Sequence, residues 1–106
     1  TWKRVYCQMT NYQYEVVYST KFKKSLKKIL KQGKNIDELK EVIDKLVVKE
    51  ELNPKYKNHK LIDDKYYKNC FECHIRPDWL LVYQYDEEGR LLLLMNTGSH
   101  SEVLNK

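Results

Sequence analysis

The sequence predicts an α+β fold in which a helical hairpin packs on one face of a four-stranded, mainly antiparallel sheet. In the first half, apolar residues recur at helical spacing in two neighbouring segments. In the second half, three short apolar runs are separated by turn residues, which is typical of strands. A chain of 106 residues suits one domain with a modest core. We expect this domain over residues 14–106, after an N-terminal extension, residues 1–13, that can be flexible.

A strand and a lysine-rich helix are expected first. Glu15–Tyr18 alternates weakly between polar and apolar side chains, which favours a strand. The helix that follows buries one apolar stripe and exposes its lysines. Its apolar residues are Phe22, Leu26, Ile29 and Leu30. Gln32-Gly33-Lys34 ends this helix.

A second amphipathic helix and a long loop come next. Asn35 followed three residues later by Glu38 resembles a capping box. The apolar face then comprises Ile36, Leu39, Val42, Ile43, Leu46 and Val47. This helix ends before Asn53-Pro54. Lys55–Lys68 has no clear period and is expected to be a loop.

The last part of the chain predicts a meander of three strands. The apolar runs are Asn69–Ile75, Trp79–Tyr85 and Leu91–Met95. A turn with Pro77 joins the first two, and a four-residue connector with Gly89 joins the last two. In a meander, the end of the first strand, the start of the second and the end of the third lie at one edge of the sheet.

Three residues that can transfer protons therefore converge at this edge: His74, Asp78 and His100. Two imidazoles and a carboxylate in one place indicate general acid–base chemistry. The competing interpretation is that each histidine is an ordinary surface or core residue. Likewise, Asp78 can simply hold the turn through its side chain.

The cysteines do not indicate a cofactor. Cys70-Phe71-Glu72-Cys73-His74 matches a haem-attachment motif. On a strand, however, Cys70 and Cys73 face opposite sides, so they cannot hold one haem or one zinc ion. We expect Cys73 in the core and Cys70 as a free thiol. Three cysteines, an odd number, suit free thiols in a reducing compartment. We therefore expect neither a metal nor another cofactor.

The charge distribution favours an anionic polymer as a ligand. The net charge is +5, and a run of lysines without an acid lies at Lys21–Lys34. A second basic stretch, Lys55–Lys68, surrounds His59. Together they indicate nucleic acid, although a lysine-rich helix can simply be a solvated face. Thr1–Gln8 lacks the apolar core of a signal peptide and no apolar run is long enough for a membrane, so we expect a cytoplasmic protein.

Three segments carry a resemblance to a known family: Asn58-His59, His74–Tyr83 and Gly98–Glu102. They resemble the YafQ branch of the RelE/ParE-type bacterial toxins, which are ribonuclease components of type II toxin–antitoxin modules. The similarity covers about Tyr14–Leu104 in the order of elements, and it is specific at the residue level from Asn58 onward. It implies a RelE-like fold.

The resemblance also implies a reaction. It implies ribosome-dependent, metal-independent cleavage of mRNA in the A site, by attack of the ribose 2′-hydroxyl on its own 3′-phosphate. By position, the family's catalytic residues correspond to His59, His74, Asp78 and His100. Histidines titrate in the range that such proton transfers need. We expect His74 and His100 to be the acid–base pair, in either assignment, with Asp78 orienting an imidazole and His59 assisting from the loop.

The implied partners are mRNA on the ribosome, an acidic antitoxin that covers the basic site, and operator DNA bound through that antitoxin; no membrane is implied. The expected RNA contacts are Arg76, Trp79, Asn96, Lys57, Lys24, Lys27 and Lys28. The chain departs from the family at Asn96, where an arginine is usual, and at Leu104, where an aromatic residue is usual. These departures keep open an alternative, a non-catalytic RNA- or antitoxin-binding module of the same fold.

Arg76 offers a replacement for the missing arginine. It lies in the turn between His74 and Asp78. Its guanidinium could supply the positive charge that Asn96 lacks. Otherwise Arg76 is an ordinary exposed turn residue, and the cation comes from Lys57, another lysine or the ribosome.

Overall fold

A mixed sheet of five strands in the order β1-β5-β4-β3-β2 forms the centre of the computed structural model, which describes residues 13–104. β1 is parallel to β5, and the other neighbouring strands are antiparallel. The strands are β1 Glu15–Tyr18, β2 His59–Lys60, β3 Phe71–Arg76, β4 Trp79–Asp86 and β5 Leu91–Gly98. Residues 1–12 of the predicted N-terminal extension lie outside the described range.

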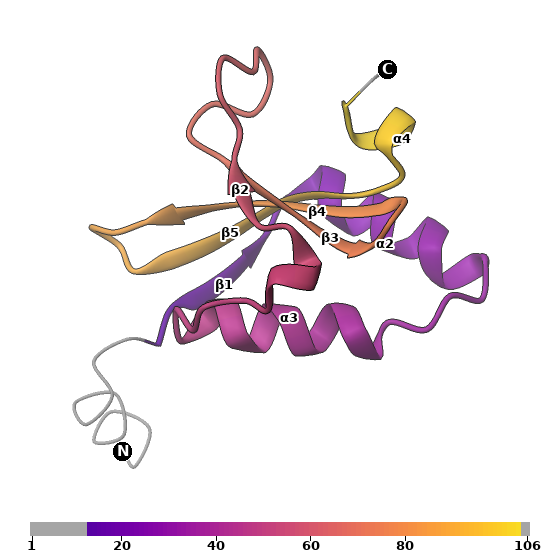
Figure 1. Cartoon of the computed structure of the whole chain (residues 1–106), viewed down its shortest axis with the longest axis horizontal. Helices are drawn as coiled ribbons and strands as arrows, with labels where there is room; N and C mark the ends of the chain where they lie inside the picture. The colour runs from indigo at the N-terminus through magenta and orange to yellow at the C-terminus, as the bar shows by residue number, and fades with distance from the viewer. Residues whose placement is uncertain (1–12, 105–106) are drawn as a thin grey trace.

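Helices cover both faces of this sheet (Figure 1). Within the described residues they are α2 Thr20–Lys31, α3 Asp37–Val47 and α4 His100–Leu104, with a 3₁₀ helix η1 at Pro54–Tyr56. The hairpin of α2 and α3 packs on one face, while the short α4 lies on the other face near the C-terminus (Figure 1). The predicted α+β class, helical hairpin and three-strand meander are confirmed. None of the helices within residues 13–104 combines the length and the apolar character that crossing a membrane requires.

The prediction of four strands was wrong. The fifth strand is β2, which lies in the segment expected to be a loop and pairs His59 with Glu72 of β3. The same segment also includes the last two residues of η1, where Asn53 accepts a hydrogen bond from the Lys55 amide at 2.9 Å. A strand of two residues shows no alternation of its own, so the pairing partner β3 decides its conformation.

The helical hairpin forms as its apolar spacing indicates. Phe22 and Ile29 of α2 are buried, and Ser19 caps this helix by accepting a hydrogen bond from the Phe22 amide at 3.0 Å. The capping box predicted for α3 was wrong. The N-cap residue is Ile36, and Asn35 before it accepts a hydrogen bond from the Asp37 amide at 2.8 Å rather than from the Glu38 amide. The Glu38 side chain contacts Arg76 instead of Asn35.

β4 separates two apolar cores. Leu81 and Tyr83 belong to the larger core beneath the helical hairpin, and Leu80 and Val82 belong to a smaller core on the opposite face. The smaller core is closed by residues of α4 and of the segment between β2 and β3: Tyr67, Cys70 and Val103, with Leu61 and Leu104 packed against them. The continuous apolar sequence of β4 is therefore explained by burial on both faces.

The two cysteines near the site lie in different cores. Cys73 is buried in the larger core and Cys70 in the smaller one, and both are free thiols. The prediction that they face opposite sides of the sheet is confirmed. Burial raises the pKa of the Cys73 thiol to about 12 and also raises the pKa of Cys70, so neither is an activated thiolate.

The third meander strand ends differently from the prediction. β5 stops at Gly98, and His100 begins α4 instead of ending the strand. The reason is a capping box: the Ser99 amide donates to Glu102 at 3.1 Å, and the Glu102 amide donates to the Ser99 hydroxyl at 3.3 Å. Gly98 has a φ of +147°, and a Cβ there would lie 3.1 Å from Glu102 Oε1, so glycine lets the capping box close.

The double burial of β4 predicts a large loss of stability when its side chains are shortened. Leu81→Ala should lower the free energy of unfolding by about 2–5 kcal/mol, because Leu81 is fully buried and the surrounding core collapses only in part. Urea denaturation measures this loss. Leu30→Ala is the matched control, because Leu30 is about half exposed on α2 and its loss should stay below about 0.5 kcal/mol. Equal losses in the two variants would show that the sheet centre is not the core.

Candidate active site at the sheet edge

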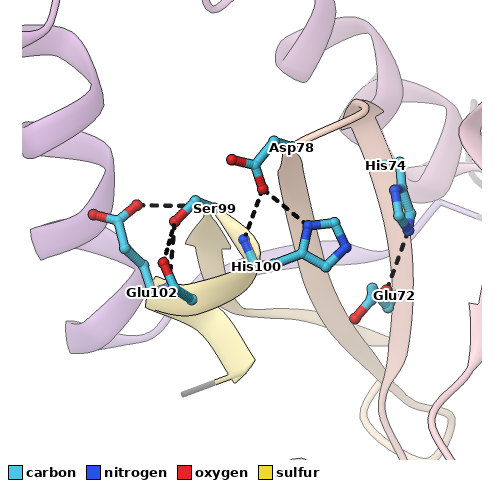
Figure 2. A network of polar contacts seen from close by, with 7 residues as sticks. Glu72, His74, Asp78, Ser99, His100 and Glu102 are labelled. Atoms are coloured by element: carbon cyan, nitrogen blue, oxygen red, sulfur yellow. Dashed lines mark hydrogen bonds and ion pairs between the residues drawn. The ribbon is translucent and has the colours of Figure 1, made fainter. Parts of the chain in front are cut away.

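Three of the predicted catalytic residues meet at one edge of the sheet (Figure 2). His74 comes from the end of β3, Asp78 from the β3–β4 turn, and His100 from the first turn of α4. The ring centroids of His74 and His100 are 5.4 Å apart. The convergence predicted from the meander is therefore confirmed, although α4 rather than the strand presents His100.

Asp78 fixes the orientation of His100. One carboxylate oxygen, Oδ1, accepts hydrogen bonds from His100 Nδ1 at 2.9 Å and from the His100 amide at 3.1 Å. These two hydrogen bonds lower the pKa of Asp78 below its ordinary value. Because an ionised carboxylate only accepts, Nδ1 carries the hydrogen, which leaves Nε2 of the half-exposed imidazole to take or give a proton.

Glu72 is a second carboxylate of the site and lies between the other two histidines. Its Oε1 is 3.3 Å from His74 Nε2 and 3.5 Å from His59 Nε2. Its side chain is only 5% exposed, and within the described residues its Oε2 has no hydrogen-bond partner. A buried carboxylate needs such partners, so the two imidazoles compensate for the burial of Glu72.

His59 lies between the Lys57 carbonyl and Glu72. Its Nδ1 is 2.8 Å from the Lys57 carbonyl, which can only accept, so Nδ1 carries a hydrogen. The ring centroids of His59 and His74 are 6.3 Å apart, so His74 lies beside both His59 and His100.

Asn96 is buried in the interior of the protein. It is 2% exposed, its Oδ1 accepts from the Ser25 hydroxyl of α2 at 2.7 Å, and its Nδ2 donates to the Tyr67 hydroxyl at 3.1 Å. Tyr67 in turn donates to the Val103 carbonyl of α4 at 2.9 Å. Asn96 therefore connects α2 to the helix that carries His100, and it has no exposed group for the RNA contact predicted for it.

Lys28 of α2 also binds α4, through the side chain of Glu102. It forms an ion pair with Glu102 Oε2, while Glu102 Oε1 accepts the Ser99 amide of the capping box. The hydrogen bonds from Lys28 and Ser99 lower the pKa of Glu102 to about 2. Lys28 is thus already neutralised within the protein. Among the lysines predicted to contact RNA on α2, Lys24 and Lys27 are exposed and have no such partner within the described residues.

The remaining predicted RNA contacts differ in exposure. Trp79 is buried at 5% exposure, and its indole Nε1 donates to the Thr97 hydroxyl at 2.9 Å. It is a packing residue beneath the site, since little of its ring is left for a base to stack on. Lys57 is exposed beside His59, and the guanidinium of Arg76 reaches Glu38 of α3 at 3.0 Å.

Sequence reasoning missed Glu72 and Glu102. A signal was present for both residues. Glu72 lies two residues before His74 and therefore on the same face of β3, and Ser99-His100-Ser101-Glu102 has the spacing of a capping box. Within residues 13–104, no three His, Cys, Asp or Glu side chains are arranged to hold a metal ion.

The fold and the site together define a small α+β protein whose histidines and carboxylates are placed for proton transfer at the end of a meander. Comparison with known proteins identifies the same class. Residues 14–105 match the family described as the bacterial toxin of type II toxin–antitoxin systems, YafQ. The mRNA interferase toxin YafQ of Escherichia coli strain B is 31% identical over 92 residues, which is 86% of this chain and 96% of that protein.

Solved structures agree with this match. A metal-bound toxin from Helicobacter pylori is 40% identical with a TM-score of 0.80, and the match covers 86% of this chain and 99% of that one. The Escherichia coli DinJ–YafQ complex gives 30% identity and a TM-score of 0.75, over 86% of this chain and 98% of that one. The chain belongs to the YafQ family of type II toxins.

The contacts of Glu102 predict a pH-dependent stability. Its carboxyl has an ordinary pKa of 4.5, and in the folded protein the pKa is about 2. The folded state thus favours the charged form, so the stabilisation is complete above pH 4.5 and is lost as the pH falls toward 2. Glu102→Gln should be less stable than the parent at neutral pH, and this difference should shrink over that interval.

Urea denaturation at several pH values measures the difference. Glu41→Gln is the control, because it removes an exposed carboxylate of α3 that is remote in sequence from α4. A stability difference between Glu102→Gln and the parent that does not change with pH would contradict the ion pair with Lys28.

Proposed function

We propose that this toxin is a metal-independent endoribonuclease that cleaves mRNA in the ribosomal A site. The observation that supports the proposal most is the Asp78–His100 pair beside His74, because it offers an oriented imidazole next to a second one. The relatives named mRNA interferase toxins support RNA as the substrate. The exposed lysines of α2 suit an anionic polymer.

In the proposed reaction, one histidine accepts the proton of the ribose 2′-hydroxyl. The 2′-oxygen then attacks the adjacent phosphorus, the bond from phosphorus to the 5′-oxygen breaks, and the other histidine protonates that leaving oxygen. The products are a 2′,3′-cyclic phosphate and a 5′-hydroxyl. His74 and His100 are the two proton-transfer residues in either assignment, and Asp78 keeps His100 Nε2 available.

The other polar residues of the site have supporting roles in this proposal. Glu72 positions the rings of His74 and His59. Positive charge is needed near the phosphate because Asn96 is neutral and buried. Lys57, exposed next to His59, provides a cation.

The partner that we propose is an acidic antitoxin. The solved complex of Escherichia coli DinJ with YafQ supports an antitoxin as the partner of this toxin. A segment with several carboxylates would bind to the exposed lysines of α2 and to the imidazoles of the sheet edge through charge complementarity. Operator DNA would be bound through the antitoxin rather than by this chain.

Histidine variants test the catalytic assignment. His74→Ala and His100→Ala should each lower the rate on the order of 10²–10⁴-fold, the usual contribution of general acid–base catalysis. The product of the parent should carry a 2′,3′-cyclic phosphate or a 3′-phosphate. Mapping of cleaved ends on ribosome-bound mRNA measures the rate and identifies the product. A 3′-hydroxyl product would exclude this mechanism.

Growth assays separate the enzyme from a non-catalytic module. Expression of the parent should stop growth, and His100→Ala should restore it while ribosome binding is retained. Growth arrest that persists in His100→Ala would indicate that binding alone is toxic, as the alternative function predicts.

Lysine variants test the proposed RNA-binding surface. Replacing Lys24 and Lys27 together by alanine should flatten the dependence of RNA affinity on salt by about 0.7–0.9 units of log–log slope for each phosphate that the lysines no longer neutralise. Lys40→Ala is the matched control, because Lys40 is an exposed lysine on α3. An unchanged salt slope in the double variant would show that this face of α2 is only solvated.

A further inference from the structure

A cavity of about 300 Å³ lies next to His74, on the side that faces α3. Its walls come from α3, η1 and the end of β3. The charged and polar residues that line it are Glu38, Lys55, Tyr56, Lys57, His74 and Arg76. His74 therefore belongs to the predicted catalytic pair and also lines this cavity, so an RNA strand lying across His74 would pass over both.

The cavity holds three basic residues and one carboxylate, so its charge is positive. Glu38 contacts three of the other residues that line the cavity. Arg76 Nε is 3.0 Å from Glu38 Oε1, and Lys55 Nζ is 3.7 Å from Glu38 Oε2. Tyr56 also donates from its hydroxyl to Oε2 at 3.3 Å. A carboxylate of the protein thus occupies the place where an external anion would meet these groups.

The pairing of Arg76 with Glu38 leaves most of the guanidinium exposed. The Arg76 side chain is 68% exposed, whereas the Glu38 side chain is only 22% exposed. Glu38 Oε1 lies 3.0 Å from Arg76 Nε, and it is buried and makes no hydrogen bond within the described residues. A guanidinium can form two parallel hydrogen bonds to a phosphate. The exposed side of Arg76 can therefore bind a phosphate in competition with Glu38.

We propose that this cavity binds the RNA phosphate next to the scissile one. Before RNA binds, Glu38 forms ion pairs with the basic residues of the cavity. The inference rests on the proposed function, since it takes RNA as the ligand. It gives Arg76 a different role from the one expected of it, because Arg76 holds the neighbouring nucleotide instead of stabilising the reacting phosphate.

Glu38 and Arg76 variants should change affinity in opposite directions. Arg76→Ala should weaken RNA binding about tenfold, the usual effect of losing one charged hydrogen bond. Glu38→Gln should strengthen binding by up to about fivefold, because the competing charge is gone and the amide has the same shape. A purely structural role of Glu38 would not produce tighter binding.

The experiment uses trinucleotides with 2′-O-methyl groups, which block the attacking hydroxyl, titrated into the full chain and followed by NMR. One probe carries two charged linkages, and two others each replace one linkage by an uncharged methylphosphonate. For the parent, removing the flanking charge should weaken binding about tenfold, and Arg76→Ala should bind the charged and the modified probe alike. Lys55→Ala gives a second, independent variant of the cavity.

Lys40→Ala and Glu41→Gln are the matched controls on the exposed side of α3, and both should bind as the parent does. A parent that binds the three probes equally, or binds none of them, overturns the inference. So does a Glu38→Gln variant that is folded but binds no tighter. Binding of an acidic peptide in place of the probes, dependent on Arg76, would reassign the cavity to the antitoxin.

Cleavage assays keep this inference distinct from the proposed function. His100→Ala should bind the trinucleotides as the parent does, while it loses cleavage. Effects of Arg76 and Glu38 in a protein that cleaves no RNA would preserve the cavity and refute the catalysis. Cleavage by a protein in which Arg76→Ala and Glu38→Gln leave RNA binding unchanged would support the catalysis and refute the role of the cavity.

Discussion

The burial of β4 on both faces is the constraint on which the rest of the structure depends. Leu80, Leu81 and Val82 are all fully buried, so the sheet must be covered twice. The helical hairpin covers one face. The other face is covered by α4 and by the segment between β2 and β3, and these coverings also bring His100 and His59 to the sheet edge. The demands of the core thus determine where the site forms.

The meander made much of the site predictable. Asp78 and His100 meet because strand order alone places a turn and a strand end side by side, and no side-chain detail is needed for that inference. The helical hairpin was equally accessible, because its apolar residues follow the helical period over both helices. Long, regular patterns of apolar residues are therefore reliable indicators of the elements that form in the folded protein.

The contacts that were not predictable are those between segments with no pattern of their own. Whether Asn96 faces RNA or the interior depends on Ser25 and Tyr67, which are far from it in sequence. The same holds for β2, whose two residues become a strand only because β3 lies beside them. Glu38 was expected to cap its own helix, and it instead meets Arg76, a residue that a helical pattern cannot indicate.

The parallel pairing of β1 with β5 has a consequence for how the protein is made. Glu15 pairs with Leu91 and Tyr18 with Leu94, so the first described strand must wait for nearly the whole chain before it finds its partner. Asp78 likewise waits for His100. Pairings of such long sequence separation form late in folding. A partly synthesised chain that ends before β5 therefore lacks both the partner strand of β1 and the Asp78–His100 pair.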